Sequence, residues 1–262
     1  MTNPILVTGG TGRLGSVLVS RLVSAGHAVR VLSRSPRPAG TGGLDRAVGD
    51  LLTGDGLDEA IAATSTVIHC ATSNDHTDVD VTATRNLTEA ALRAGRPHLI
   101  YISIVGVDRV SLPYYRAKLE SERLVEDSGL PWTIQRTTQF HDLVAWMSSV
   151  QRWLPATLMP SGVSFQPIDV GEVADRLSSL AHAKPRGRAD DMGGPEIRTA
   201  TDLARSWARA HGRRRPVLAV PAPGAAFRAF RQGAHLAPEQ AVGRITFERY
   251  LTATGPYPGR LG

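Results

Sequence analysis

The sequence predicts an α/β protein built on a doubly wound parallel sheet, with a small lobe at its C-terminal end. Three observations support this fold class. Apolar runs alternate with amphipathic segments over roughly the first 170 residues. A glycine-rich segment joins the first apolar run to the first amphipathic one, and residues 98–104 are largely apolar, as in the centre of a parallel sheet.

The elements of the first 136 residues can be placed in order. Residues 5–8 are apolar or β-branched and predict the first strand, and the helix after it has an apolar face from Leu14 to Leu22. Further strands are predicted at 28–32, 47–48, 66–70, 98–104 and 131–136. Helices are predicted at 57–63, 78–94 and 113–128. Residues 1–136 are therefore expected to form a nucleotide-binding core.

Beyond Phe140 the alternation is less regular. Asp169 is predicted as the N-cap of a helix that extends to His182, and 184–194 as a polar loop. Further helices are predicted at 143–153, 199–211, 225–233 and 246–253, with short strands at 163–168 and 217–220. Residues 137–262 are expected to form a mixed substrate lobe packed on the same domain.

The composition favours a cytoplasmic protein. One cysteine, Cys70, excludes an intramolecular disulfide, and no signal peptide or membrane span is evident. The net charge of +6 arises from residues 186–262, which contain 13 arginines and 6 acidic residues. This segment could serve an acidic ligand, a partner or nucleic acid, or be a solvated surface. Because Arg213–Arg215 is its one tight cluster and has no interleaved aromatics, a solvated surface is favoured and no nucleic-acid partner is expected. We also expect no membrane partner, and a monomer or homodimer.

The glycine-rich segment predicts a dinucleotide site. Gly9, Gly12 and Gly15 are spaced by three between the first strand and the first helix. Gly9 allows a sharp turn, Gly12 lets the backbone approach a pyrophosphate, and Gly15 lets the helix lie close to the sheet. The N–H groups at the start of the helix then attract phosphate.

The segment TGGTGRLG, Thr8–Gly15, resembles the TGxTGxxG signature of extended and atypical short-chain dehydrogenase/reductases, particularly the NmrA-like group. The resemblance implies a Rossmann-type fold that binds NAD(P). Within the segment, cofactor contacts are expected from the three glycines and from Thr11, Arg13 and Leu14.

The residues after the second strand predict NADP(H) as the cofactor. This position holds Ser33, Arg34 and Arg37 and no acid. An arginine here accommodates a 2′-phosphate, whereas a carboxylate would bind the free 2′-hydroxyl of NAD. Arg13 could reach the same phosphate; alternatively, these arginines simply lie in solvent.

Two further loops follow strands at the same edge of the sheet. Asp50 and Leu51 resemble the family's acidic position beside adenine, although Asp50 could equally form a turn or cap. Ala71, Thr72 and Ser73 follow the fourth strand, at the carboxyl edge where ligands lie in such folds. Cys70 is expected to be a small buried residue.

Tyr114 and Lys118 reproduce the YxxxK spacing of short-chain dehydrogenases and stand on one helix face. The resemblance implies that Lys118 holds the nicotinamide ribose and that Tyr114 exchanges a proton with the substrate. Lys118 is one of only two lysines among thirty basic residues, which indicates a specific need for an ammonium. The family's catalytic serine falls on Val105, and Ser103 matches a serine at the strand end, so the catalytic set is incomplete or rearranged.

The segment QRTTQFHD, Gln135–Asp142, resembles the family stretch that lines the nicotinamide and the substrate. Thr138 and Phe140 are expected to contact the cofactor, and Gln139 and His141 the substrate. The eight histidines show no metal-binding spacing, so no metal site is predicted.

The resemblance implies an NADPH-dependent oxidoreductase that reduces a small organic carbonyl, quinone or enone. Two alternatives remain open. The incomplete catalytic set and the basic C-terminal segment suit an NADP(H)-binding redox sensor without turnover. The same fold could also serve a non-redox epimerase, lyase or cyclase.

Overall fold

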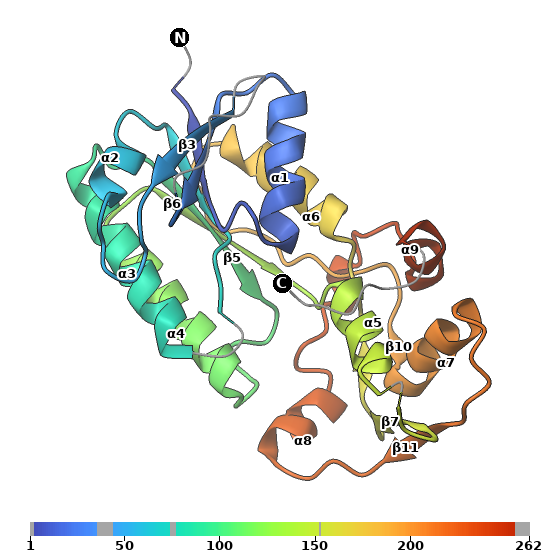
Figure 1. Ribbon diagram of the computed structural model, residues 1–262. Coiled ribbons are helices and arrows are strands. Elements are labelled where there is room, and N and C mark those ends of the chain that lie inside the picture. Colours follow the sequence, from blue (N-terminus) through green and yellow to red (C-terminus); the bar gives the residue numbers. More distant parts are fainter. Residues whose placement is uncertain (1–2, 36–43, 74–76, 152, 255–262) are drawn as a thin grey trace. The chain divides into compact units, whose positions relative to one another are not determined.

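The computed structural model describes residues 3–35, 44–73, 77–151 and 153–254. The chain forms two compact units (Figure 1). Unit 1 comprises Met1–Ser103, Pro113–Gln135 and Val173–Ala189, and unit 2 comprises Ile104–Leu112, Arg136–Glu172 and Asp190–Gly262.

Unit 1 is built around a seven-stranded sheet in the order β3-β2-β1-β4-β5-β6-β9. The registered strand pairs are parallel, for example Ile5 opposite both Val29 and Thr66. The strands are β1 Ile5–Thr8, β2 Val29–Ser33, β3 Leu44–Val48, β4 Thr66–His69, β5 His98–Ile104, β6 Trp132–Thr137 and β9 Gly187–Arg188. The predicted Rossmann-type α/β fold is confirmed.

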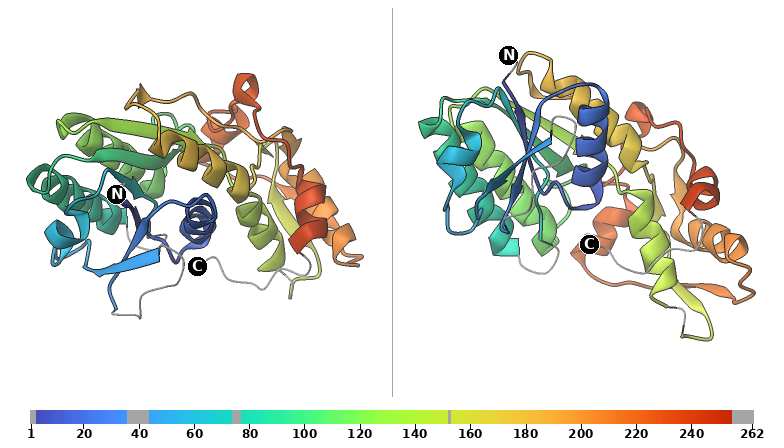
Figure 2. Two further views of the ribbon diagram at one scale, coloured as in Figure 1. Left: turned by 90° about the horizontal axis from the view of Figure 1, so that it is seen from above. Right: turned by 45° about the horizontal axis from the view of Figure 1, so that its top comes forward.

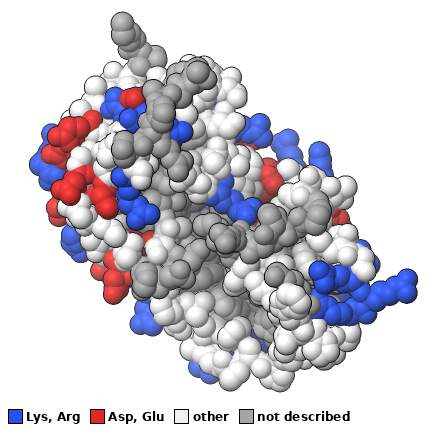
Figure 3. All heavy atoms as spheres, in the orientation of Figure 1, with Lys and Arg blue, Asp and Glu red and all other residues white. Residues whose placement is uncertain are grey.

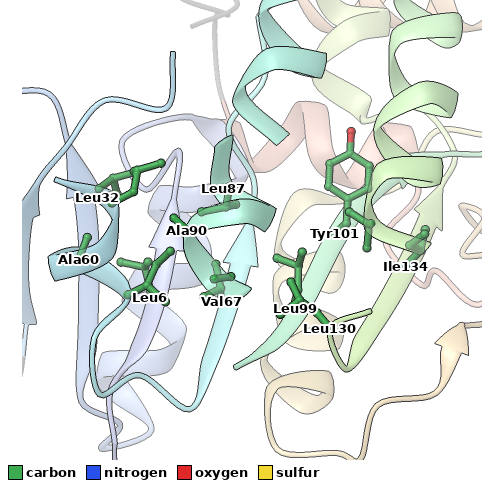
Figure 4. Close-up of a cluster of buried hydrophobic side chains, with 14 residues drawn as sticks. Leu6, Leu32, Ala60, Val67, Leu87, Ala90, Leu99, Tyr101, Leu130 and Ile134 are labelled. Carbon is green, nitrogen blue, oxygen red and sulfur yellow. The ribbon is translucent and has the colours of Figure 1, made fainter. Parts of the chain in front are cut away.

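Helices cover both faces of this sheet (Figure 2). One face carries α1 (Arg13–Ser24) and α6 (Val170–Ala181), and the other carries α2 (Leu57–Ile61), α3 (Thr77–Arg93) and α4 (Pro113–Asp127). Between the sheet and the second group lies a core that includes Leu6, Leu87 and Leu99, each without exposed surface (Figure 4). Burial of such aliphatic side chains supplies the main stabilising free energy of the layer.

Unit 2 has its own apolar core, in which α7 (Ala200–Ala210) packs against both α5 (His141–Ser149) and α9 (Phe247–Thr254). Thr199 caps α7 by accepting a hydrogen bond from the Asp202 backbone N–H. The remaining elements are β7 Thr157–Pro160 parallel to β11 Val217–Val220, β8 Ser164–Phe165 antiparallel to β10 Arg198–Thr199, α8 Ala225–Arg231 and a 3₁₀ turn at Pro238–Gln240.

Several predicted elements differ from the structure, and the strand predicted at 163–168 is limited to Ser164–Phe165. The predicted loop 184–194 contains β9, which pairs with β6 at Thr133 and Ile134 and so depends on a partner distant in sequence. Strand β3 begins at Leu44 rather than residue 47, and α5 begins at His141 and ends at Ser149 rather than spanning 143–153. The predicted cap of α6 is correct, because Asp169 Oδ1 accepts the Gly171 N–H at 2.8 Å.

The basic C-terminal segment has a partly structural role. Basic side chains gather at the right of Figure 3, in the region of α7, where Arg205, Arg209, Arg213 and Arg214 are exposed. Arg215 instead donates to the backbone oxygens of Gln151 and Leu154, and the Arg213 guanidinium lies 5.8 Å from the Trp207 ring. Among the described helices, none is both long and apolar enough to cross a bilayer.

Candidate functional site

The turn between β1 and α1 is compact because two of its glycines leave no space for a side chain. Gly9 has φ +65°, and a Cβ there would lie 2.6 Å from the backbone nitrogen of Ala71. A Cβ on Gly15 would lie 2.1 Å from the Gly9 carbonyl oxygen. The Gly12 N–H donates to that same oxygen at 2.9 Å. The backbone path is therefore fixed by contacts within the turn and with the end of β4.

The N-terminus of α1 suits an anion. Its N-cap, Gly12, provides no side-chain cap, and the first turn contains no acid. The early amides of a helix lack intrahelical acceptors and lie at the positive end of its dipole. Thr11 is exposed, Arg13 is half-buried and Leu14 is buried in the same turn. The backbone of Arg13, Leu14 and Gly15 can thus hold a pyrophosphate, as the sequence predicts.

The end of β2 offers a hydroxyl and a cation. The Ser33 hydroxyl accepts from the Ser35 N–H at 3.3 Å and donates to the Ser35 carbonyl at 3.0 Å, which turns the chain. Arg34 is exposed beside it, and Arg37 lies outside the described residues. An exposed guanidinium at this position can bind a phosphate without first breaking a buried contact.

Asp50 forms a turn after β3. Its Oδ1 accepts the Leu52 N–H at 2.7 Å. Formation of a turn was one of the two roles that the sequence allowed for Asp50, the other being contact with adenine. Leu51 packs on the core of unit 1, and the Asn86 side chain donates to the carbonyls of Leu51 and Leu52. Asn86, on α3, is therefore a support of this loop that the sequence analysis missed.

Lys118 lies at the centre of a buried polar cluster at the carboxyl ends of β4 and β5. The residue is 3% exposed, and its Nζ donates to the Ile102 carbonyl at 3.4 Å. The same nitrogen lies 4.0 Å from Asp80 Oδ2 and 4.9 Å from the centre of the Tyr101 ring. Burial disfavours the charged form, yet the oxygens of Tyr101, Tyr114 and Asp80 raise the pKa of Lys118 above its usual value.

Asp80 joins this lysine to the loop after β4. Its Oδ2 accepts the Thr72 hydroxyl at 2.5 Å and its Oδ1 accepts the Ser73 N–H at 2.6 Å. The Thr72 hydroxyl also lies 3.4 Å from the Tyr114 hydroxyl. The structure therefore brings together Thr72, Ser73, Tyr114 and Lys118, all predicted from sequence. Asp80 was missed, although it lies in the first turn of a long helix, where an acid is easily attributed to the helix dipole.

Ser103 and Ala71 also lie at the carboxyl edge of the sheet, near the ends of β5 and β4. Ser103 is 2% exposed, and its hydroxyl has no hydrogen-bond partner among the described residues. Such an unpaired hydroxyl is what a bound polar group would satisfy. The Ala71 N–H donates to the Thr8 hydroxyl at 3.4 Å, which also contacts His69 Nδ1 at 2.6 Å. Burial and the charge of Lys118 lower the pKa of His69 to about 3, so this histidine is neutral.

The residues of the segment predicted to line the nicotinamide and the substrate, Thr138 to His141, lie in unit 2. Thr138 donates to the Gln166 carbonyl at 2.5 Å, and Phe140 bridges to Ile168 and precedes α5. Gln139 donates through Nε2 to the His235 carbonyl at 3.5 Å, whereas its buried Oε1 has no partner among the described residues. His141 Nε2 contacts the Ile245 carbonyl at 2.9 Å and its ring stacks on Tyr250. Its buried Nδ1 likewise has no partner among the described residues.

The described residues contain no group of three or more His, Cys, Asp or Glu side chains placed to hold a metal ion. Cys70 is half-buried, and burial raises the pKa of its thiol to about 12 despite the opposing effect of Lys118. The site presents an anion-binding turn, a lysine, a tyrosine and a carboxylate.

Comparison with known proteins identifies the family of the chain. A family model described as NAD(P)H-binding matches residues 9–153. A (4-alkanoyl-5-oxo-2,5-dihydrofuran-3-yl)methyl phosphate reductase from Streptomyces griseus is 32% identical over 227 residues, covering 80% of this chain and 74% of that protein.

Two solved structures have the same fold at low sequence identity. An NADPH-dependent quinone oxidoreductase from Escherichia coli, complexed with NADPH, superposes with a TM-score of 0.82 at 16% identity, over 95% of this chain and 99% of the other. A nucleoside-diphosphate-sugar epimerase from Staphylococcus aureus gives a TM-score of 0.80, also at 16% identity and with the same coverage.

Proposed function

Because the chain belongs to the NAD(P)H-binding family, we propose that it is an NADPH-dependent oxidoreductase of the atypical short-chain dehydrogenase/reductase type that reduces a small organic carbonyl, quinone or enone. The observation that carries the proposal is the buried Lys118 beside Tyr114, in the same unit as the anion-binding glycine turn. The reductase from Streptomyces griseus supports a reductive reaction.

The cofactor fits the residues that are present. The α1 amides would hold the pyrophosphate, Arg34 and Arg13 the 2′-phosphate, and Lys118 the nicotinamide ribose. The unpaired Ser103 hydroxyl and the uncapped helix start are two features that such a ligand would satisfy. Bound NADPH supplies a hydride, and the protein supplies orientation and a proton.

The proton comes from the Tyr114 hydroxyl. As the substrate receives the hydride, the O–H bond of Tyr114 breaks and its proton goes to the substrate oxygen, or to carbon in an enone. The ammonium of Lys118 stabilises the phenolate until water reprotonates it. Gln139 and His141 are proposed as substrate contacts.

Turnover with variants tests this function. NADPH consumption is followed with the purified chain and a panel of quinones, enones, ketones and aldehydes. We expect turnover with at least one class, a decrease of roughly a hundred- to ten-thousand-fold in Tyr114→Phe, and weaker NADPH binding in Lys118→Met. Tyr115→Phe is the matched control, because it makes the same change at the adjacent, buried position and is expected to retain turnover.

A redox sensor is the second candidate, favoured by the buried Val105 at the position of the family's catalytic serine. A sensor binds NADPH in calorimetry and shows no turnover across the whole panel. That combination would contradict the reductase and support the sensor, whereas equal turnover in wild type and Tyr114→Phe would remove only the assigned role of Tyr114.

A further inference from the structure

Asp80 is a buried carboxylate that the reductase function above does not use. It is 4% exposed and receives two short hydrogen bonds, from the Thr72 hydroxyl at 2.5 Å and the Ser73 N–H at 2.6 Å. Lys118 Nζ lies 4.0 Å away. A carboxylate is buried at a high cost in free energy unless it is paired, so these partners form a unit with it.

The direction of the hydrogen bonds at this carboxylate follows from the number of protons available. An ionised carboxylate can only accept, so the single hydroxyl proton of Thr72 is donated to Asp80. The Thr72 oxygen then presents a lone pair to Tyr114, whose hydroxyl lies 3.4 Å away and must be the donor of that pair. The chain of donors therefore runs from Tyr114 through Thr72 to Asp80, and it retains a proton on Tyr114.

The charges around Lys118 also favour a protonated Tyr114. Tyr101 on β5 lies under the ammonium, and His69 and Cys70 at the end of β4 interact with it. At neutral pH these three groups are uncharged, since burial lowers the pKa of His69 to about 3 and raises the pKa of Cys70 to about 12, and also raises the pKa of Tyr101. Of the described groups that raise the pKa of Lys118, Asp80 is the one carboxylic acid, and the other two are the phenols of Tyr101 and Tyr114.

On the basis of the proposed reductase function, we propose that Asp80 is a positioning residue that keeps Tyr114 protonated for catalysis. The negative charge of Asp80 offsets the positive charge of Lys118. Thr72 links Asp80 to Tyr114, because it donates to the carboxylate and accepts from the Tyr114 hydroxyl. Without Asp80 the ammonium would favour the phenolate, and a phenolate has no proton to give to the substrate.

A titration of the protein without cofactor reports this effect directly. Ionisation of Tyr114 is followed by ultraviolet absorbance of tyrosinate, with Tyr114→Phe subtracted to isolate that residue. In Asp80→Asn we expect the midpoint to move to lower pH by about one unit, the size of effect that one nearby charge produces. The matched control is Asp78→Asn, which removes an exposed charge from the same helix and should leave the midpoint unchanged.

The pH dependence of NADPH-driven turnover is the second measurement. Since the protonated tyrosine is the active form, the loss of activity at high pH should begin at lower pH in Asp80→Asn by the same amount. Thr72→Val should shift both curves less far in the same direction, and Thr72→Ser should restore them because it returns the hydroxyl. These two variants also decide the matter if Asp80→Asn fails to fold.

Unchanged midpoints in Asp80→Asn and Thr72→Val would overturn the role of Asp80 while leaving the reductase function in place. If the tyrosinate midpoint shifts in Asp80→Asn but the wild-type protein turns over no substrate, the reductase function is rejected. The coupling of Asp80 to Tyr114 would then still stand. Equal shifts in Asp80→Asn and Asp78→Asn would indicate a general charge effect and would also overturn the proposal.

Discussion

The two units differ in how many of their buried polar side-chain atoms have a hydrogen-bond partner. The comparison is between the strand ends of unit 1 and the buried polar residues of unit 2. In unit 1, Asp80, Thr72, Ser73 and Lys118 satisfy one another and nearby backbone, and Ser103 Oγ is the cluster member without a partner among the described residues. In unit 2, Gln139 Oε1, His141 Nδ1 and His235 Nδ1 are buried and lack partners within the same described set.

This difference indicates two kinds of task. A closed network of short hydrogen bonds holds side chains in one geometry, which proton transfer requires. A buried unpaired acceptor costs about 1–3 kcal/mol, so its retention calls for a ligand or a bound water as its partner. The closed network of unit 1 therefore suits the proton transfer proposed above, whereas the unpaired buried atoms of unit 2 remain open to further polar contacts.

The largest expected effect follows from adding a methyl group to the glycine turn of unit 1. In Gly15→Ala the new Cβ would lie 2.1 Å from the Gly9 carbonyl, so the turn must shift. We expect saturable NADPH binding to be lost and stability to fall by about 1–3 kcal/mol, measured by calorimetry and urea unfolding. Gly26→Ala is the control, because its Cβ meets nothing within 4 Å. It should lose stability through its left-handed φ alone, and intact binding in both variants would contradict the role of the turn.

Acid should destabilise both units through their buried histidines. Burial lowers the pKa of His69 in unit 1 to about 3 and that of His235 in unit 2 to about 4. Below pH about 6.5 the unfolded chain binds these protons and the folded chain does not, so stability falls as pH falls, by about 1.4 kcal/mol per unit for each histidine.

Urea unfolding between pH about 7 and about 5 measures this slope. His69→Asn and His235→Asn should each reduce this slope by about 1.4 kcal/mol per pH unit, the contribution of one proton bound on unfolding. A slope that neither substitution changes would show that these rings are not buried as neutral groups.

Removal of the arginine at the end of β2 should change the choice of cofactor. Arg34→Ala is expected to weaken NADPH binding roughly tenfold to a hundredfold, the equivalent of a hydrogen bond to a charged group. NADH binding should be unaffected, because NADH lacks the 2′-phosphate. Arg85→Ala removes another exposed arginine of unit 1 as the control. Equal losses for NADPH and NADH would argue against a contact between Arg34 and the 2′-phosphate.

The smallest expected effect concerns an unpaired atom of unit 2. Gln139→Leu gives up one long hydrogen bond of 3.5 Å, so the free energy of unfolding should change by less than about 1 kcal/mol. If Oε1 binds substrate, the substrate KM should rise about threefold to tenfold, with NADPH affinity unchanged. An unaltered KM would leave the unpaired oxygen of Gln139 without a role in substrate binding.

Local patterns were sufficient to predict most of unit 1. The apolar run of β5 gave both ends of that strand correctly, and the YxxxK spacing identified two members of the polar cluster, the buried Lys118 and the half-buried Tyr114. Asp80 could not be identified as the third, because its partners Thr72 and Lys118 meet it only in the folded sheet. Strand β9 was missed for the same reason, since two residues acquire strand geometry from pairing with β6.

Unit 2 was less predictable because its short elements are fixed by distant contacts. The Arg213–Arg215 cluster reads as a uniform basic surface, yet Arg215 is held by the carbonyls of Gln151 and Leu154. The pairing of Gln139 Nε2 with His235, 96 positions away in sequence, has no local signal either. Substrate identity depends on such contacts, which is why the motifs indicate the cofactor more clearly than the substrate.

Calorimetric titration of the purified full chain with NADPH and, in parallel, with NADH is the most direct test of a turn that binds the pyrophosphate beside arginines that bind the third phosphate. We predict one NADPH site per chain, with affinity for NADPH at least about tenfold greater than for NADH. No heat of binding with either nucleotide, or equal affinity for both, would contradict that prediction.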